Sequence, residues 1–159
     1  PKKDGIFNMS QIEYQHKGGH YFAGAALHTR HYPIDDEGEM AASNDATNNT
    51  TCAWWIYGEQ NLWTAGDKSI AAMLQYSENT SRSNGCYRFA EVGGAYKDSK
   101  NECGVSAQFA QFHQGIERTL ELTWKRQITE SIALQPYFQY INNKNGDFTV
   151  LSARLYYSF

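Results

Sequence analysis

Apolar and polar residues alternate along most of this chain, in segments that turn-forming residues separate. The clearest segment lies between residues 117 and 125, where Leu120, Leu122 and Trp124 alternate with Glu, Thr and Lys side chains. A period of two is typical of a β-strand with one apolar and one polar face. We count roughly nine such segments of about ten residues each, the length that a tilted strand needs to cross a bilayer. The pattern therefore predicts an all-β chain.

The connections between these segments alternate in length. If the chain ends on the inner side of a membrane, every second connection lies on that side as well. These connections are all short: Lys17–Gly19, Thr64–Lys68, Lys97–Glu102 and Thr129–Ser131. The other connections, which would lie on the outer side, include the two longest, Tyr32–Thr51 and Glu78–Gly85, and two short ones at Gln114 and Asn142–Asp147. Short inner turns and long outer loops are the rule in transmembrane barrels. The spacing favours a transmembrane antiparallel up-and-down β-barrel, in which we expect Pro136 to mark a local bulge.

Composition narrows the class further. The chain has 159 residues, 41% of them hydrophobic and 14% aromatic, and it reads as a single domain over residues 1–159. Mean hydropathy is −0.65, and no apolar run reaches the roughly 20 residues of a membrane-spanning helix. The net charge of −3 argues against nucleic acid as a partner.

The cysteines and histidines give little support for metal or catalytic chemistry. Cys52, Cys86 and Cys103 form no CxxC pair, so a zinc site is not expected. Cys52 and Cys86 both lie at outer ends of expected strands, which makes a disulfide between them one hypothesis and unpaired small apolar residues the other. His20 and His28 share a face but lie about 26 Å apart on an extended strand, too far to share a metal. We expect no enzyme activity and no cofactor.

Three stretches carry a family resemblance. They are YGEQNLW at residues 57–63, a run over residues 119–141 that contains LQPYFQY, and the closing LSARLYYSF. Together they resemble the carbohydrate-selective porins of Gram-negative outer membranes, the OprB-type family. The chain departs from that pattern by lacking an N-terminal half and by carrying NNKNGD at residues 142–147 in place of a proline-and-glycine turn.

The resemblance implies a larger protein and a transport function. Family members resemble monomeric barrels of about 16 strands, so this chain would be the C-terminal portion and the N-terminal half of the same barrel its partner. About nine strands would leave two raw edges, which lipid does not tolerate. The expected setting is the bacterial outer membrane with its lipid and lipopolysaccharide. The expected function is passive or facilitated diffusion of small sugars.

A channel selects solutes through the width, charge and hydrogen-bonding groups of its lining. Sugar hydroxyls donate and accept hydrogen bonds, and sugar C–H faces lie well on aromatic rings, so a mixed polar and aromatic lining suits neutral sugars. The expected lining comprises Arg30, Trp55, Tyr57, Glu59, Glu91, Gln108, Glu117, Glu121, Lys125, Gln135, Tyr137, Gln139, Arg154 and Tyr156. Glu59, Glu121 and Arg154 are the leading candidates for solute contact. For each residue the alternative is that it hydrates the lumen and pairs across strands, as in any porin.

The opposite parity places aromatic rings near strand ends on the expected lipid side. These are Trp54, Tyr96, Trp124 and Tyr157, and amphipathic rings at that level form an interfacial girdle. Two other classes stay open. A soluble, lectin-like β-sandwich that binds glycans would bury the Leu120, Leu122 and Trp124 face against a second sheet. An outer-membrane barrel could also act as an enzyme or adhesin.

Overall fold

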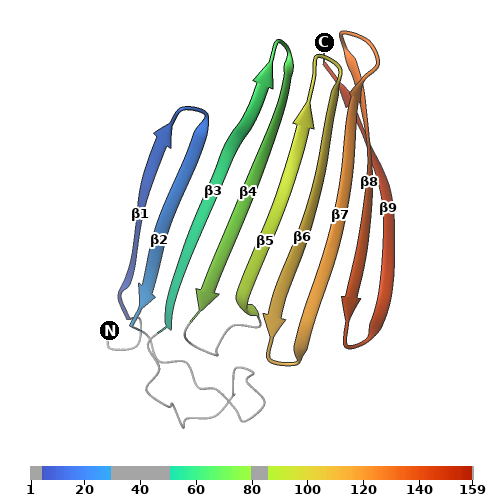
Figure 1. The fold of residues 1–159 in the computed structure, drawn as a ribbon. Helices are drawn as coiled ribbons and strands as arrows, with labels where there is room; N and C mark the ends of the chain where they lie inside the picture. The colour runs from blue at the N-terminus through green and yellow to red at the C-terminus, as the bar shows by residue number, and fades with distance from the viewer. Residues whose placement is uncertain (1–4, 30–50, 80–85, 159) are drawn as a thin grey trace.

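The described residues fold into one antiparallel sheet. The computed structural model describes residues 5–29, 51–79 and 86–158. Within them nine strands follow one another in the sheet in chain order (Figure 1). Their bounds are β1 (Phe7–His16), β2 (Gly19–His28), β3 (Thr51–Ala65), β4 (Lys68–Asn79), β5 (Cys86–Lys97), β6 (Asn101–Phe112), β7 (Gly115–Gln127), β8 (Ile132–Asn143) and β9 (Gly146–Tyr157). This confirms the all-β, up-and-down antiparallel prediction.

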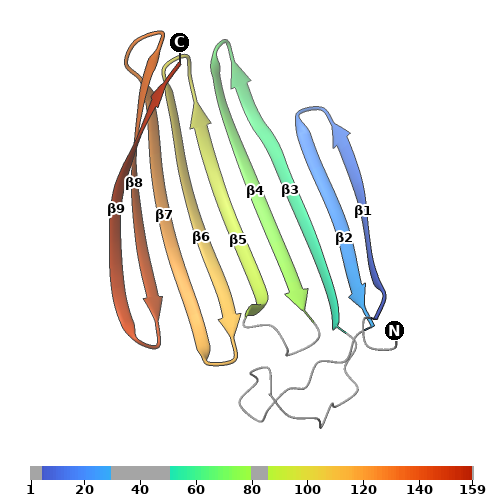
Figure 2. The ribbon, with the colours of Figure 1, turned by 180° about the vertical axis from the view of Figure 1, so that it is seen from behind.

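The strands tilt together and alternate in direction. The turns after β1, β3, β5 and β7 lie at one end of the sheet together with the C-terminal end of β9 (Figures 1 and 2). In the first of these turns Lys17 and Gly18 both have positive φ, 42° and 77°, the backbone of a type I′ hairpin that matches strand twist. The strand ends flanking residues 30–50 and 80–85 lie at the other end. Most of both expected long loops falls outside the described residues, and Glu78 and Asn79 belong to β4.

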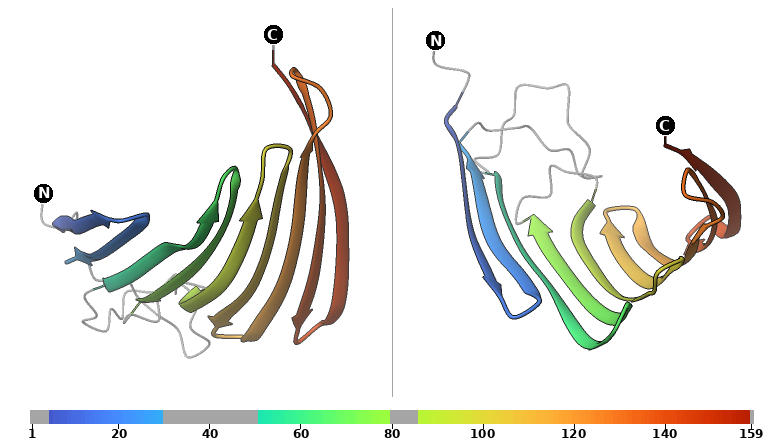
Figure 3. Two further views of the ribbon diagram at one scale, coloured as in Figure 1. Left: turned by 45° about the horizontal axis from the view of Figure 1, so that its top comes forward. Right: turned by 90° about the horizontal axis from the view of Figure 1, so that it is seen from above.

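The sheet is curved and open. Seen from above, it bends from β1 round to β9 into an arc with a hollow side and an outer side (Figure 3). β1 and β9 pair only with β2 and β8, so the described strands do not close into a barrel. We call the hollow side the inner face and the other side the outer face.

Strand register sorts the side chains between these faces. Across the sheet Leu120 aligns with Ala107 and Tyr140, while its neighbour Glu121 aligns with Ser106 and Gln139. Leu120 and Leu122 are 41% and 43% exposed on the outer face, and Leu151 and Leu155 reach 77% and 72%. Ala133 is the one hydrophobic residue buried within the described ranges. The sheet is thus a single layer whose apolar face carries no second layer of described residues.

No helix among the described residues is long and apolar enough to span a membrane.

The strand irregularities lie elsewhere than expected. Pro136 aligns with Ala153 in an unbroken ladder between β8 and β9, so the bulge expected there is absent. The aligned pairs with β7 are interrupted next to Pro136 and resume at Arg126 and Leu134 without a shift. The proline therefore turns its missing donor toward β7 and keeps its ladder with β9. The register shifts instead between Asn61 and Trp63, and between Cys86 and Arg88.

The hypothetical disulfide between Cys52 and Cys86 is not formed. The two residues lie on β3 and β5, with β4 between them. Two strand spacings separate their backbones by about 9–10 Å, beyond the roughly 7 Å limit for bridged Cα atoms. The register shift before Arg88 also aligns Cys86 with Phe112 on the inner face, whereas Cys52 aligns with Leu27 on the outer face.

Candidate functional site on the inner face

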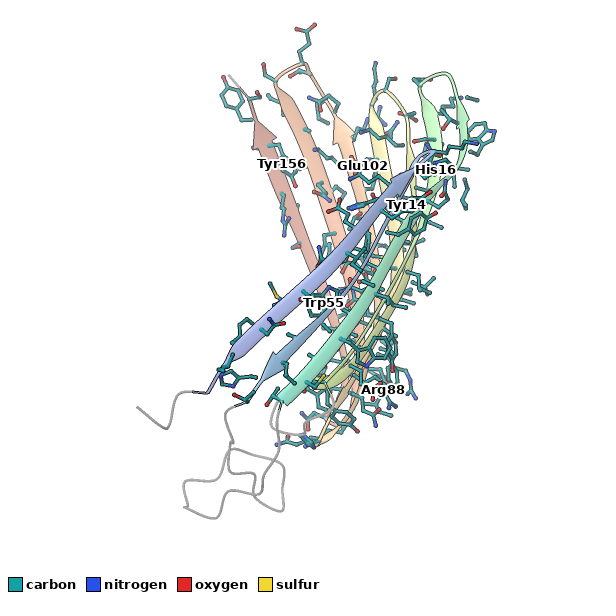
Figure 4. All side chains as sticks on the ribbon, turned by 90° about the vertical axis from the view of Figure 1, so that its left-hand side faces the viewer. Tyr14, His16, Trp55, Arg88, Glu102 and Tyr156 are labelled. Carbon is teal, nitrogen blue, oxygen red and sulfur yellow. The ribbon has the colours of Figure 1, made fainter. Side chains whose placement is uncertain are left out.

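The strand registers bring the expected lining residues onto one face. In Figure 4 the labelled side chains of Trp55 and Tyr156 belong to this inner face, and those of Tyr14 and Arg88 belong to the outer face. Every described member of the expected lining lies on the inner face: Trp55, Tyr57, Glu59, Glu91, Gln108, Glu117, Glu121, Lys125, Gln135, Tyr137, Gln139, Arg154 and Tyr156. Arg30 lies outside the described residues. The expected girdle residues Trp54, Tyr96, Trp124 and Tyr157 share the outer face.

Three carboxylates border a shallow hollow at mid-height of the inner face. The hollow measures about 260 Å³, and Glu59, Glu91 and Glu121 reach it from β3, β5 and β7. Its lining also contains small residues of β4, β5 and β6: Ala71, Ala72, Gly93, Gly94, Ala95, Gly104 and Ser106. A Cβ on Gly93 would stand 3.1 Å from the Val105 carbonyl oxygen. The small residues leave this space: Ala71, Gly93, Ala95, Gly104 and Ser106 lie at inner-face positions, and Ala72 and Gly94 lie at the outer-face positions between them.

Each of these carboxylates accepts a hydrogen bond from a neutral donor. The Tyr57 hydroxyl donates to Glu59 at 2.6 Å, and the Tyr137 hydroxyl donates to Glu121 at 3.0 Å. The Gln108 amide donates to Glu91 at 3.1 Å. No ion pair to Glu91 or Glu121 is formed by the described residues. Among the described residues, the partners of these two carboxylates on the hollow side are therefore neutral hydrogen-bond donors.

A histidine links Glu59 to one further carboxylate near the short-turn end. His20 Nε2 lies 2.8 Å from Glu13, and its Nδ1 lies 3.8 Å from Glu59. The sequence pattern did not place Glu13 in the lining, because the first segment has apolar residues at both parities. The pairing of Glu13 with Phe22 sets that register.

An aromatic strip follows β2 and β3 on the same face. The Phe22 and Tyr57 rings stack with centroids 4.7 Å apart and planes at 15°. Beside them the Trp55 indole covers Gly24 and donates through Nε1 to Gln11 at 3.1 Å. Phe22 was not among the expected lining residues, since an apolar ring on a polar face gives no signal in the alternation. Phe22 and Tyr57 cover one face of each other, and the Trp55 indole lies over Gly24, so the strip offers aromatic faces against which a sugar ring can stack.

The remaining lining residues fall into separate groups. Toward the short-turn end, the Lys125 ammonium lies 4.5 Å from the Tyr156 ring centroid, and the Tyr156 hydroxyl donates to Gln135 at 2.6 Å. Toward the other end, Asn143 donates to Glu117 at 3.1 Å. Gln139 aligns with Glu121, and Arg154 aligns with Gln135. Of the described members of the expected set, four line the hollow itself, namely Tyr57, Glu59, Glu91 and Glu121.

Two acidic residues in the short turns accept backbone hydrogen bonds, Asp98 within its own turn and Asp67 from the neighbouring hairpin. Asp98 accepts hydrogen bonds from the backbone N–H groups of Lys100 and Asn101 at 2.9 and 2.8 Å, and these lower the pKa of Asp98 to about 2. Asp67, in the turn between β3 and β4, accepts from Ser99 at 3.2 Å, and that contact lowers the pKa of Asp67.

The inner face offers hydrogen-bonding and stacking groups. Within the described ranges no three His, Cys, Asp or Glu side chains are grouped so as to hold a metal ion. Carboxylates, amides and phenols instead face one open surface, where they can exchange hydrogen bonds with a polyhydroxylated solute. The chain matches no protein-family model, no curated protein and no solved structure. Its function therefore has to be inferred from this geometry.

Proposed function

We propose that this chain forms part of the wall of an outer-membrane β-barrel through which small sugars diffuse. The observation that carries the proposal is the separation of the two faces. From β2 to β8 the registers place exposed apolar side chains outside and a polar, aromatic surface on the hollow side, whereas the edge strands β1 and β9 expose apolar side chains on both faces. In transmembrane barrels the outer residues contact lipid and the inner residues contact water.

The exposed outer face favours lipid as its environment. Burying apolar surface is worth about 25 cal/mol per Å², so large exposed side chains in water are unfavourable when they are contiguous. Leu74, Val92 and Leu120 are 53%, 55% and 41% exposed in one row across the sheet. The strands of 10–15 residues are also long enough to cross the hydrocarbon layer at a tilt.

The open edges are the reason to propose further strands. The backbone groups along β1 and β9 that face away from the sheet would be unsatisfied in hydrocarbon, where only closed barrels are stable. We propose that additional strands of the same barrel, its N-terminal half, complete the wall to about 16 strands. The resemblance to carbohydrate-selective porins is the basis for that number and for the outer membrane as the location.

The inner face supports neutral sugars as the solutes. The aromatic strip of Phe22, Trp55 and Tyr57 gives flat surfaces for C–H faces. The Glu59 carboxylate lies beside it, and the Glu121 carboxylate lies across the hollow that Tyr57 also lines; both accept hydrogen bonds from hydroxyl groups. Such a channel acts by diffusion and requires no cofactor.

The alternative of a soluble glycan-binding sandwich lacks its second layer. A sandwich packs two sheets face to face about 10 Å apart. The described strands form one sheet, and Leu120, Leu122 and Trp124 remain exposed on its outer face. No observation favours the enzyme or adhesin alternative.

Conductance and solute uptake test the proposal together. The full-length protein, refolded in detergent, is added to a planar bilayer and to liposomes loaded for swelling in neutral mono- and disaccharides. We expect stepwise conductance increments and faster swelling in monosaccharide. A protein that stays in buffer without detergent and gives no conductance would refute the channel. Conductance without sugar-dependent swelling would retain the channel and remove the sugar assignment.

A further inference from the structure

The outer face is not uniformly filled with large apolar side chains, because it contains a groove. The groove measures about 870 Å³ and runs over strands β4 to β8. Its walls include Leu74 and Tyr76 on one side and Leu120 and Tyr140 on the other. All of these side chains belong to the outer face by register.

Two alanines account for the depression. One row across the sheet runs Leu74, Val92, Ala107, Leu120, Tyr140, and the next row runs Tyr76, Ala90, Phe109, Arg118, Asn142. Ala90 and Ala107 therefore lie on neighbouring strands in neighbouring rows, surrounded by larger side chains. A chain of methylene groups laid over them would contact walls on both sides, and such close contacts add up over many atoms.

The groove has a cation in its lining. Arg118 lies four residues into β7, near the end of the sheet opposite the short turns. Among the described residues no carboxylate forms an ion pair with it. The two outer-face carboxylates of this region have other partners, because Glu78 pairs with Arg88 at 3.2 Å and Asp147 accepts from Asn142 at 2.6 Å.

We propose that this groove binds an anionic lipid of the surrounding membrane, with an acyl chain over Ala90 and Ala107 and the headgroup phosphate on Arg118. The inference rests on the proposed membrane location. A cation on the lipid-facing surface costs about 2–4 kcal/mol at the bilayer midplane and little near the interface, and Arg118 lies near the end of its strand. A guanidinium can donate to two phosphate oxygens at once, so an anionic headgroup would supply the negative charge that no described carboxylate supplies to Arg118.

Native mass spectrometry of the detergent-solubilised full-length protein tests the site. The protein is mixed with phosphatidylglycerol or with zwitterionic phosphatidylcholine of the same acyl chains, and retained lipid is counted. We expect the wild type to retain the anionic lipid about fivefold or more over the zwitterionic one, as charge-assisted hydrogen bonds allow. Arg118→Gln should reduce that ratio to about one.

Matched variants distinguish lipid binding in the groove from non-specific lipid binding to the rest of the outer face. Ala107→Leu fills the groove and should lower retention of both lipids, whereas Ala153→Leu, on the outer face of β9, should not. Arg126→Gln removes an outer-face cation of the same strand outside the groove, beside Trp124, and should preserve the preference.

Three results would overturn the proposal: equal retention of the two lipids by the wild type, an unchanged ratio in Arg118→Gln, or a change of oligomeric state in the groove variants. The last would assign the groove to contact between protein subunits. Conductance of the same preparations distinguishes the lipid site from the proposed channel. Loss of the lipid preference with conductance retained would refute only the lipid site.

Discussion

The indole of Trp55 lies directly over Gly24 of the neighbouring strand. A Cβ added at Gly24 would stand 2.3 Å from Cζ2 of that ring, closer than any real contact. Only glycine gives the ring room to lie along the sheet and donate to Gln11. The flat part of the proposed sugar surface therefore depends on a residue that has no side chain.

Gly24→Ala should displace the indole and weaken solute stacking. The ring is a side chain and can rotate away, so we expect a modest loss of stability, about 1–3 kcal/mol, as for other overpacking substitutions. The readout is the Trp55 emission, taken as the difference between each protein and its Trp55→Phe partner, together with the rate of sugar uptake. Ala26→Ser, at an inner-face position of the same strand, is the control. An unchanged Trp55 emission would show that the ring does not rest on Gly24.

Glu121→Gln should slow sugar uptake without unfolding the protein. The amide keeps the size of the carboxylate and can still accept from Tyr137, but it loses the charge that strengthens a hydrogen bond to solute. We expect uptake in liposomes to fall about two- to tenfold, since a neutral hydrogen bond is weaker than a charge-assisted one by about 0.5–1.4 kcal/mol. Glu117→Gln, on the same strand outside the hollow, should leave uptake near the wild-type rate. If Glu59→Gln and Glu121→Gln both transport normally, the carboxylates only hydrate the surface.

Adjacent residues of β7 give a sharp test of the lipid-facing side. Leu122 and Thr123 lie at the middle of the strand on opposite faces. Leu122→Lys should impair insertion by about 2–4 kcal/mol, because the charge would enter hydrocarbon, whereas Thr123→Lys should insert normally. The folded fraction after refolding into liposomes, measured by the gel shift between heated and unheated samples, gives the comparison. Equal folding of both variants would contradict the assignment of the faces.

Acid should loosen the turn between β5 and β6. The pKa of Asp98 is lowered to about 2 by the backbone N–H groups of Lys100 and Asn101. An unfolded aspartate titrates near pH 4, so this stabilisation is complete above about pH 4 and is lost as the pH falls toward 2. Hydrogen exchange at the Lys100 and Asn101 amides should accelerate, relative to amides of the strand interior, over that interval. Asp98→Asn should show weaker protection at pH 7 and a smaller change with acid.

The alternation in the sequence predicted the strands and the two faces, because a period of two is a local property. Glu121 and Leu122 could be assigned to opposite sides without any knowledge of their neighbours. The relationships between strands could not be predicted in the same way. Trp55 reaches Gly24 only because β2 and β3 pair in one particular register, and the residues between them carry no pattern that sets it.

The disulfide hypothesis for Cys86 and the bulge expected at Pro136 failed for different reasons. The extra residue at Tyr87 inverts the face of Cys86, and no turn signal or break in alternation marks it. Pro136 does look like a break in the sequence, yet its ladder with β9 is regular because its missing donor points to the other neighbour. Glu13 was not predicted as a lining residue, because β1 has apolar residues on both faces and its alternation does not indicate which face is polar.

β1 and β9 run in the same direction, because eight reversals separate them. They cannot meet as antiparallel neighbours, so a continuous antiparallel wall needs an odd number of strands between them. Two copies joined around a common pore axis would place β9 beside β1 in parallel, and antiparallel junctions would require one copy to be upside down in the bilayer. Closure of a fully antiparallel wall in one orientation therefore needs an odd number of further strands between β9 and β1, which a second copy of this nine-stranded sheet alone does not supply without a parallel junction.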